Sequence, residues 1–363
     1  MPSLGLRNGR YGRVLLPCWL ALLGAIGAAG PALAGSFTVL GPQNYLRESG
    51  EPVTVITNFS VLDPTTQLMI KIYNGGLVDG EFDRVSSSVI KINGADLVGP
   101  SEFNQNVAFL EMPIPLNPNN ALSVELHGQP GGGITILIIG VDNAPPTITA
   151  AVSPQPNASG WNHANVTVTF TCQDVTSGMA SCTSPVTVTS EGSNQVVTGT
   201  ATDRAGNTAS TSVTVKLDKT PPSITPTVSP APNAFGWNNT DVTVSYACDD
   251  SLSGVGTCPP PNIVSVEGAG QSISASASDV AGNVAAVTTT HNLDRTPPTI
   301  AASASPAPNA NGWNNTDVTV TFFVADGLSG VASSSSPVVA TTDGANQQVS
   351  GFVTDRAGNT ATA

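Results

Sequence analysis

Apolar and polar residues alternate with a period of two through long stretches of the chain. From Val166 to Cys172, apolar residues alternate with threonine, and the same alternation returns at 242–248 and 318–324. Successive side chains of a strand point to opposite faces, so this pattern predicts half-buried strands in antiparallel sheets. Similar runs at 186–189, 196–202 and 212–217, separated by turn residues, raise the prediction to six or seven strands per unit. That density is typical of a β-sandwich.

Residues 35–142 show further strand patterns that do not belong to these units. The predicted strands are Val53–Ile56, Leu68–Tyr73, Val89–Ile92, Val107–Glu111, Leu122–Leu126 and Ile134–Val141. Asn74-Gly75-Gly76 and Asn93-Gly94 are turn signals, and the glycine-rich segment 127–133 is expected to join the last two strands as a hairpin. We therefore predict an independent antiparallel sandwich here. It loosely resembles leading β-domains of bacterial secreted proteins that carry Ig-like or Rhs-type repeats.

The remainder of the chain repeats with a period of 76 residues. Gly-Trp occurs at 160–161, 236–237 and 312–313, and Ala-Gly-Asn at 205–207, 281–283 and 357–359. A Pro-Pro pair opens each unit at Pro145, Pro221 and Pro297, with an aspartate three positions earlier. Proline restricts its own backbone and that of the preceding residue, so these linkers are expected to be short and semi-rigid, as in a spacer.

The predicted fold is all-β: an N-terminal antiparallel β-sandwich followed by tandem β-sandwich repeats. The expected division is 1–34 signal peptide, 35–142 N-terminal domain, 143–218 repeat 1, 219–294 repeat 2 and 295–363 repeat 3. Because the chain stops four residues after Asn359, repeat 3 is expected to lack its last strand, as in a fragment or an early-terminated gene product.

The first 34 residues have the organisation of a secretory signal. Three arginines precede the apolar stretch 14–30, and Pro31-Ala32-Leu33-Ala34 supplies small residues for cleavage after Ala34. A retained anchor helix is the alternative, which Pro17 and several glycines disfavour. No other stretch is long and apolar enough for a spanning helix. The expected mature chain is exported, extracellular or at the cell surface.

Composition and charge restrict the partners. Charged residues make up 10% and aromatic residues 5% of a chain rich in Gly and Pro, which disfavours helices. The formal charge is −13, and it becomes −16 without Arg7, Arg10 and Arg13. So acidic a chain is not expected to bind nucleic acid or anionic lipid.

Four cysteines remain beyond Cys18, in two pairs with identical spacing. Cys172 and Cys182 correspond to Cys248 and Cys258, whereas repeat 3 has Val324 and Ser334, so both partners are missing together. A disulfide in each of the first two repeats fits an exported protein. A metal site is the alternative, but two thiols without a histidine in register fall short of four ligands.

Three aspartates recur in every repeat. They lie in the linker, in the Asp-x-x-Ser-Gly loop and in the Asp-x-Ala-Gly-Asn turn: Asp142, Asp174, Asp203; Asp218, Asp250, Asp279; Asp294, Asp326, Asp355. Such carboxylates could hold Ca²⁺ by oxygen coordination. The alternative is structural, because Asp first and Gly fourth suit a type I turn. We expect no cofactor other than this calcium.

The motifs Asp-x-Thr-Pro-Pro, Gly-Trp-Asn, Asp-x-x-Ser-Gly-Val and Asp-x-Ala-Gly-Asn resemble those of bacterial Ig-like repeats, with Ala144 and Met179 as departures in the first copy. The resemblance covers 142–363 and implies an Ig-like fold of the kind found in bacterial surface and secreted proteins, including adhesins. Trp161, Trp237 and Trp313 are expected to pack in cores or between repeats. Stacking on a sugar or partner is their alternative role.

The sequence contains no recognisable catalytic arrangement. His127, His163 and His291 are scattered and do not recur between repeats, and neither a nucleophile elbow nor a phosphate loop is found. The expected function is therefore non-catalytic: adhesion-type repeats that form a stalk and present the N-terminal domain to an unknown surface protein or glycan. The alternatives are a glycan- or ligand-binding module in 35–142, or the N-terminal appendage of a larger secreted enzyme or Rhs-type protein.

Overall fold

The computed structural model describes residues 35–78 and 80–363, so the expected signal peptide and its cleavage at Ala34 lie outside the described residues. All regular elements of the described chain are β-strands, and none of its segments is a helix able to cross a membrane. The chain divides into two compact units. The first runs to Ala144 and includes 175–178 and 203–207, and the second contains the rest.

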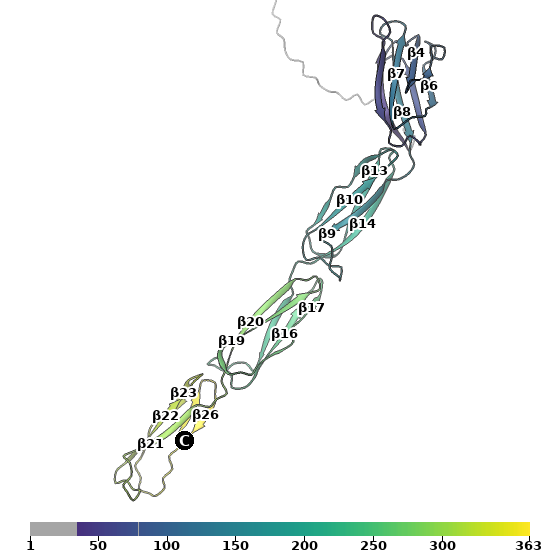
Figure 1. Cartoon of the computed structure of the whole chain (residues 1–363). Helices are drawn as coiled ribbons and strands as arrows, with labels where there is room; N and C mark the ends of the chain where they lie inside the picture. The colour runs from purple at the N-terminus through teal and green to yellow at the C-terminus, as the bar shows by residue number, and fades with distance from the viewer. Residues whose placement is uncertain (1–34, 79) are drawn as a thin grey trace, which may run out of the picture. The chain divides into compact units, whose positions relative to one another are not determined.

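The N-terminal domain consists of two four-stranded antiparallel sheets (Figure 1). One sheet has the order β1 (Ser36–Leu46), β8 (Gly133–Val141), β3 (Leu68–Asn74), β6 (Phe109–Pro113). The other has the order β2 (Thr54–Ser60), β7 (Asn119–His127), β4 (Ser87–Ile92), β5 (Ala95–Val98). Alternate residues of the central strands, such as Ile70, Ile136 and Leu122, are fully buried and form one core between the sheets. This all-β sandwich agrees with the alternating pattern.

The expected hairpin at 127–133 is wrong. The strands that it connects lie in different sheets, because β7 pairs with β2 and β4 whereas β8 pairs with β1 and β3. Both strands carry buried residues at alternate positions, so each needs a cover for its apolar face. The glycine-rich segment provides the crossover that places the two strands in opposite sheets.

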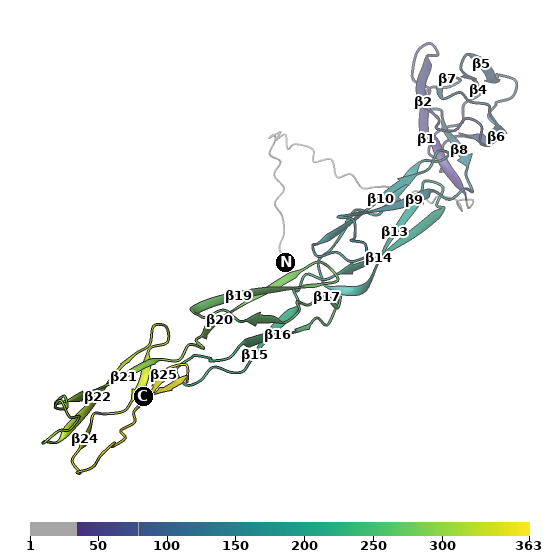
Figure 2. The same cartoon turned by 60° about the horizontal axis from the view of Figure 1, so that its bottom comes forward.

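Each repeat consists of two three-stranded antiparallel sheets. Repeat 1 has the orders β12 (Val186–Val188), β10 (Val166–Gln173), β9 (Thr147–Ser153) and β11 (Met179–Cys182), β13 (Gly192–Asp203), β14 (Thr208–Leu217). Repeat 2 has β15 (Ser223–Ser229), β16 (Val242–Asp249), β18 (Asn262–Val264) and β17 (Val255–Thr257), β19 (Gly268–Asp279), β20 (Val284–Leu293). The long ladders β13–β14 and β19–β20 can be followed in Figure 2.

Repeat 3 keeps the same strand order with shorter strands in its second sheet. Its sheets are β21 (Thr299–Ser305), β22 (Val318–Ala325), β24 (Val338–Ala340) and β23 (Val331–Ser334), β25 (Phe352–Asp355), β26 (Thr360–Thr362). The last strand, expected to be missing, is present with three residues that pair with β25. The turn between β25 and β26 is closed by hydrogen bonds between Asp355 and Asn359: the Asp355 N–H donates to the Asn359 carbonyl, and the Asn359 N–H donates to Asp355 Oδ1.

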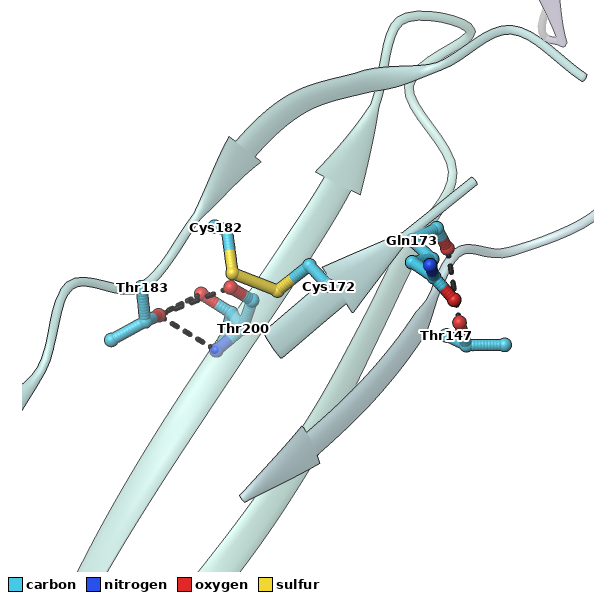
Figure 3. Close-up of a disulfide and its surroundings, with 6 residues drawn as sticks. All are labelled: Thr147, Cys172, Gln173, Cys182, Thr183 and Thr200. Carbon is cyan, nitrogen blue, oxygen red and sulfur yellow. Dashed lines mark hydrogen bonds between the residues drawn. A yellow bond between two sulfur atoms is a disulfide. The ribbon is translucent and has the colours of Figure 1, made fainter. Parts of the chain in front are cut away.

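Both expected disulfides are present. Cys172 bonds to Cys182 and Cys248 to Cys258, with Cα atoms 6.0 and 5.9 Å apart. Figure 3 shows the first, which joins β10 to β11 and so connects the two sheets of repeat 1. Beside it, the Thr183 hydroxyl accepts a hydrogen bond from the Thr200 N–H and donates to the Thr200 carbonyl, which fastens the chain after β11 to β13 (Figure 3).

Candidate functional site: the repeat junctions

The residues that recur at the repeat boundaries come together around the linker aspartates. Asp218 follows β14 directly and Asp294 follows β20, and both are fully buried. The N–H of each donates to an asparagine carbonyl of the preceding repeat, Asn162 and Asn238 respectively. A charged residue so deeply buried needs partners on every side, and the linker geometry supplies them.

The next repeat holds the linker aspartate through two contacts, and a third hydrogen bond crosses the boundary beside it. The Ser253 N–H donates to Asp218 Oδ2 at 3.0 Å, and Asn283 Nδ2 donates to the Asp218 carbonyl at 2.9 Å. Across the same boundary, Asn157 of repeat 1 donates to the Val280 carbonyl at 2.8 Å. The boundary between repeats 2 and 3 has equivalent bonds at equal distances, made by Ser329, Asn359 and Asn233.

The preceding repeat holds the residues after the aspartate. Glu191 accepts hydrogen bonds from the Lys219 N–H at 2.6 Å and from the Thr220 hydroxyl. Glu267 makes the corresponding bonds with Arg295 and Thr296. Each linker is therefore hydrogen-bonded to both flanking repeats. We call this set of contacts, made around Asp218 or Asp294, the junction clasp.

Two carboxylate clusters lie within the second unit. One ligand oxygen from each of Asp218, Asp250 and Asp279 lies within 4.8 Å of the others, and Asp294, Asp326 and Asp355 do the same. The Asp in the turn motif accepts two backbone N–H bonds and one side-chain bond, for example from Asn283 to Asp279 at 2.8 and 2.7 Å. The turn given as the alternative role is therefore present at Asp279 and Asp355. Their oxygen atoms are also of the type that Ca²⁺ prefers.

In the first repeat the equivalent aspartates are divided between the units. Asp142 and Asp203 are buried in the first unit, where Asn207 bonds to both. Asp174 belongs to the second unit and is half-buried. The turn at Asp203 has the expected form, because the Gly206 N–H donates to the Asp203 carbonyl and Gly206 has a φ of 91°.

The tryptophans differ although their register is constant. Trp161 is buried, with the Lys216 ammonium 5.9 Å from its ring centroid, whereas Trp237 is half-buried and Trp313 is 56% exposed. The expectation of packing is wrong for Trp313. Lys216 lies near the end of β14 and corresponds to Asn292 in β20.

The histidines do not form a common site. His127 lies in the first unit and pairs with Glu125 at 3.2 Å, whereas His163 and His291 lie in the second. His291 is buried on β20 with its Nε2 2.7 Å from the Thr289 hydroxyl, and burial lowers its pKa. The clasp residues Glu191, Glu267 and Asn157 were not singled out from sequence, although their recurrence at the 76-residue period could have revealed them.

No family model matches the sequence, and no curated protein matches it. Among solved structures, the chain is similar to the crystal structure of a tetra-tandem repeat in the extending region of a large adhesion protein. The identity is 14%, the match covers 85% of this chain and 94% of that one, and the TM-score is 0.23. At so low a TM-score the two chains do not superpose as wholes.

Proposed function

We propose that this protein is a non-catalytic secreted or cell-surface protein whose Ig-like repeats serve as an adhesion-type stalk that presents the N-terminal β-domain. The disulfides support an oxidising, exported location, since such bonds are rare in the cytosol. The partner of the presented domain is an unknown surface protein or glycan.

The junction clasp is the observation that carries this proposal. Two successive boundaries have the same donors, acceptors and distances around Asp218 and Asp294. A stalk needs each module to be fastened to the next, and a linker bonded to both neighbours meets that need. A catalytic role would instead favour convergent groups within one cavity.

An in-register deletion tests the stalk. Removing residues 219–294 joins Asp218 to Arg295 and so restores a complete linker sequence. In the producing cells, we expect antibodies to the N-terminal domain to label intact cells in both strains, while attachment to surfaces falls several-fold in the deletion strain. The control removes 219–280, which shifts the register and is expected to abolish correctly folded protein. Unchanged attachment, or loss of an enzymatic activity alone, would contradict the proposal.

We also propose calcium as the ligand of the two carboxylate clusters in the second unit. A cation bound only by the folded state raises the melting temperature, so EGTA is expected to lower it and added Ca²⁺ to restore it. The variant Asp250→Asn removes one anionic ligand from the first cluster and should reduce the response. A melting temperature that EGTA leaves unchanged would remove this proposal.

A further inference from the structure

The four edge strands of the N-terminal domain are not equally protected against pairing with another chain. β1 is interrupted by two register shifts and by Pro42, which has no N–H. β5 has only four residues and carries Asp96, and β6 has five residues with a charge and a terminal proline. Bulges, charges, prolines and short length are the usual means by which sheet edges avoid intermolecular pairing.

β2 has none of these protections. Its seven residues, Thr54–Ser60, contain no charge and no proline, and they pair with β7 along their whole length without a register shift. No other strand of the described chain pairs with its outer edge. This edge therefore offers a straight row of unpaired backbone groups.

The same edge exposes large aliphatic side chains. Val53, Val55 and Ile56 are 71%, 45% and 64% exposed. Val53 and Val55 also line a cavity of about 160 Å³, together with apolar residues such as Leu126 and with the charged Arg47, Glu48 and Glu51. By contrast, the exposed positions of β9, another uncharged edge strand, are Thr, Ala and Ser. The β2 edge thus combines free backbone with apolar surface, which is typical of a docking edge.

We propose that β2 pairs antiparallel with β2 of a second copy of this chain, centred on Thr57. In that register Val55 faces Phe59, Thr57 faces Thr57, Thr54 faces Ser60 and Ile56 faces Asn58 of the other copy. Pairs of a β-branched residue with an aromatic one, and of two hydroxyl residues, are favourable cross-strand combinations. Apart from the two Ile56–Asn58 pairs, the segment is therefore complementary to itself when reversed, and this points to a second copy rather than to an unrelated strand.

Charge does not select the occupant, but it restricts where two copies can meet. Two copies of a chain with a formal charge of −13 repel one another. An uncharged strand is where the two can approach with the least repulsion. In a symmetric contact of this kind, each copy contributes the same edge, so neither copy has a free β2 edge left to bind a third copy. The expected product is a dimer rather than a fibre.

The mass of the purified chain in solution provides the first test. Light scattering after size-exclusion chromatography should show the wild-type mass rising twofold towards a dimer with concentration. Ile56→Lys places a charge on the outward face of β2 and should keep the chain monomeric. The matched control Val196→Lys alters a residue of β13 that is 61% exposed and should leave the dimer unchanged. A wild-type chain that stays monomeric, or two variants that behave alike, would overturn the proposal.

Cysteine cross-linking provides the second test, because the four cysteines of the described chain are already paired. Thr54→Cys and Ser60→Cys chains are each expected to resist cross-linking alone, since like positions lie about 20 Å apart in the proposed register. A mixture of the two places the thiols opposite each other and should give a covalent heterodimer after mild oxidation. Cross-linking by either variant alone, or none in the mixture, would overturn the register.

Discussion

The first and third repeats share the same landmarks in the same register but differ in how much they bury. In repeat 1, Val166, Val168 and Phe170 of β10 are buried, whereas their equivalents in β22 are only half-buried. Among the described residues of repeat 3, the buried apolar side chains are Val353 and Ala357. Repeat 3 also lacks the disulfide that repeat 1 has, because Val324 and Ser334 replace the two cysteines.

The difference separates what the nearby sequence determines from what the opposite sheet determines. The strand pattern of residues 318–325 produces β22 even where its apolar face lacks a complete cover. In repeat 1 that cover comes from the ladder between the twelve residues of β13 and the ten of β14. In repeat 3 the strands β25 and β26 have four and three residues, and the positions that correspond to Val215 and Leu217 lie past Ala363. Strand formation follows the sequence nearby, and burial follows the second sheet.

Removing the cover in repeat 1 should therefore have the largest effect. Leu217 ends β14 and is fully buried, so Leu217→Ala is expected to cost about 2–5 kcal/mol of unfolding free energy in that repeat. Leu293→Ala should do the same in repeat 2. Hydrogen exchange read by mass spectrometry reports each repeat separately. Thr214→Ala, on the exposed face of β14, is the control. An equal loss of stability in Leu217→Ala and in the control Thr214→Ala would contradict our explanation of burial.

Exchange of the disulfide residues should have the next largest effect. Cys172→Val with Cys182→Ser gives repeat 1 the residues of repeat 3 and is expected to destabilise it by roughly 2–4 kcal/mol under oxidising conditions. The reverse pair, Val324→Cys with Ser334→Cys, should stabilise repeat 3. Denaturant unfolding with and without reductant measures both changes. A repeat 1 whose stability does not depend on reductant would show that the bond contributes little.

A smaller effect is expected where glycine lies against an aromatic ring. A Cβ on Gly199 would lie 2.3 Å from the Phe170 ring, and one on Gly351 would lie 2.3 Å from Phe322. Gly199→Ala should cost roughly 1–3 kcal/mol through overpacking. Gly351→Ala should cost less, because the half-buried Phe322 can move. Repeat 2 has Ala275 and Tyr246 at these positions. Equal losses in the two glycine variants would mean that ring burial is not the cause.

Much of the all-β architecture could be predicted from alternation, because side-chain period depends only on neighbouring residues. β1 was missed because Gly41, Pro42 and the two register shifts interrupt its pattern. The sheet assignment of β7 and β8 was also wrong, since a glycine-rich connection fits both a hairpin and a crossover. Pairing between distant strands depends on which apolar faces need cover, and no local motif records that.

The junctions were only partly predictable. The period of 76 residues identified Asp218 and Asp294, but their burial comes from contacts with two repeats that no single motif contains. The burial of Trp161 could not be foreseen from its register alone, because the residue that lies over it comes from β14. The calcium ligands and the export signal stay predictions.

The smallest effect that we expect is a pH dependence confined to repeat 2. Burial lowers the pKa of His291 in the folded chain below its ordinary value of 6.5, so the unfolded chain binds the proton at higher pH. The free energy of unfolding of repeat 2 is therefore at its highest above pH 6.5, as far as His291 is concerned. It decreases as the pH drops through 6.5 towards the folded-state pKa. Repeat 1 has Val215 at this position, so His291→Val should remove the dependence. Hydrogen exchange of repeats 1 and 2 at neutral and mildly acidic pH measures the difference. A loss in repeat 2 that persists in His291→Val would show that His291 is not the cause of the pH dependence.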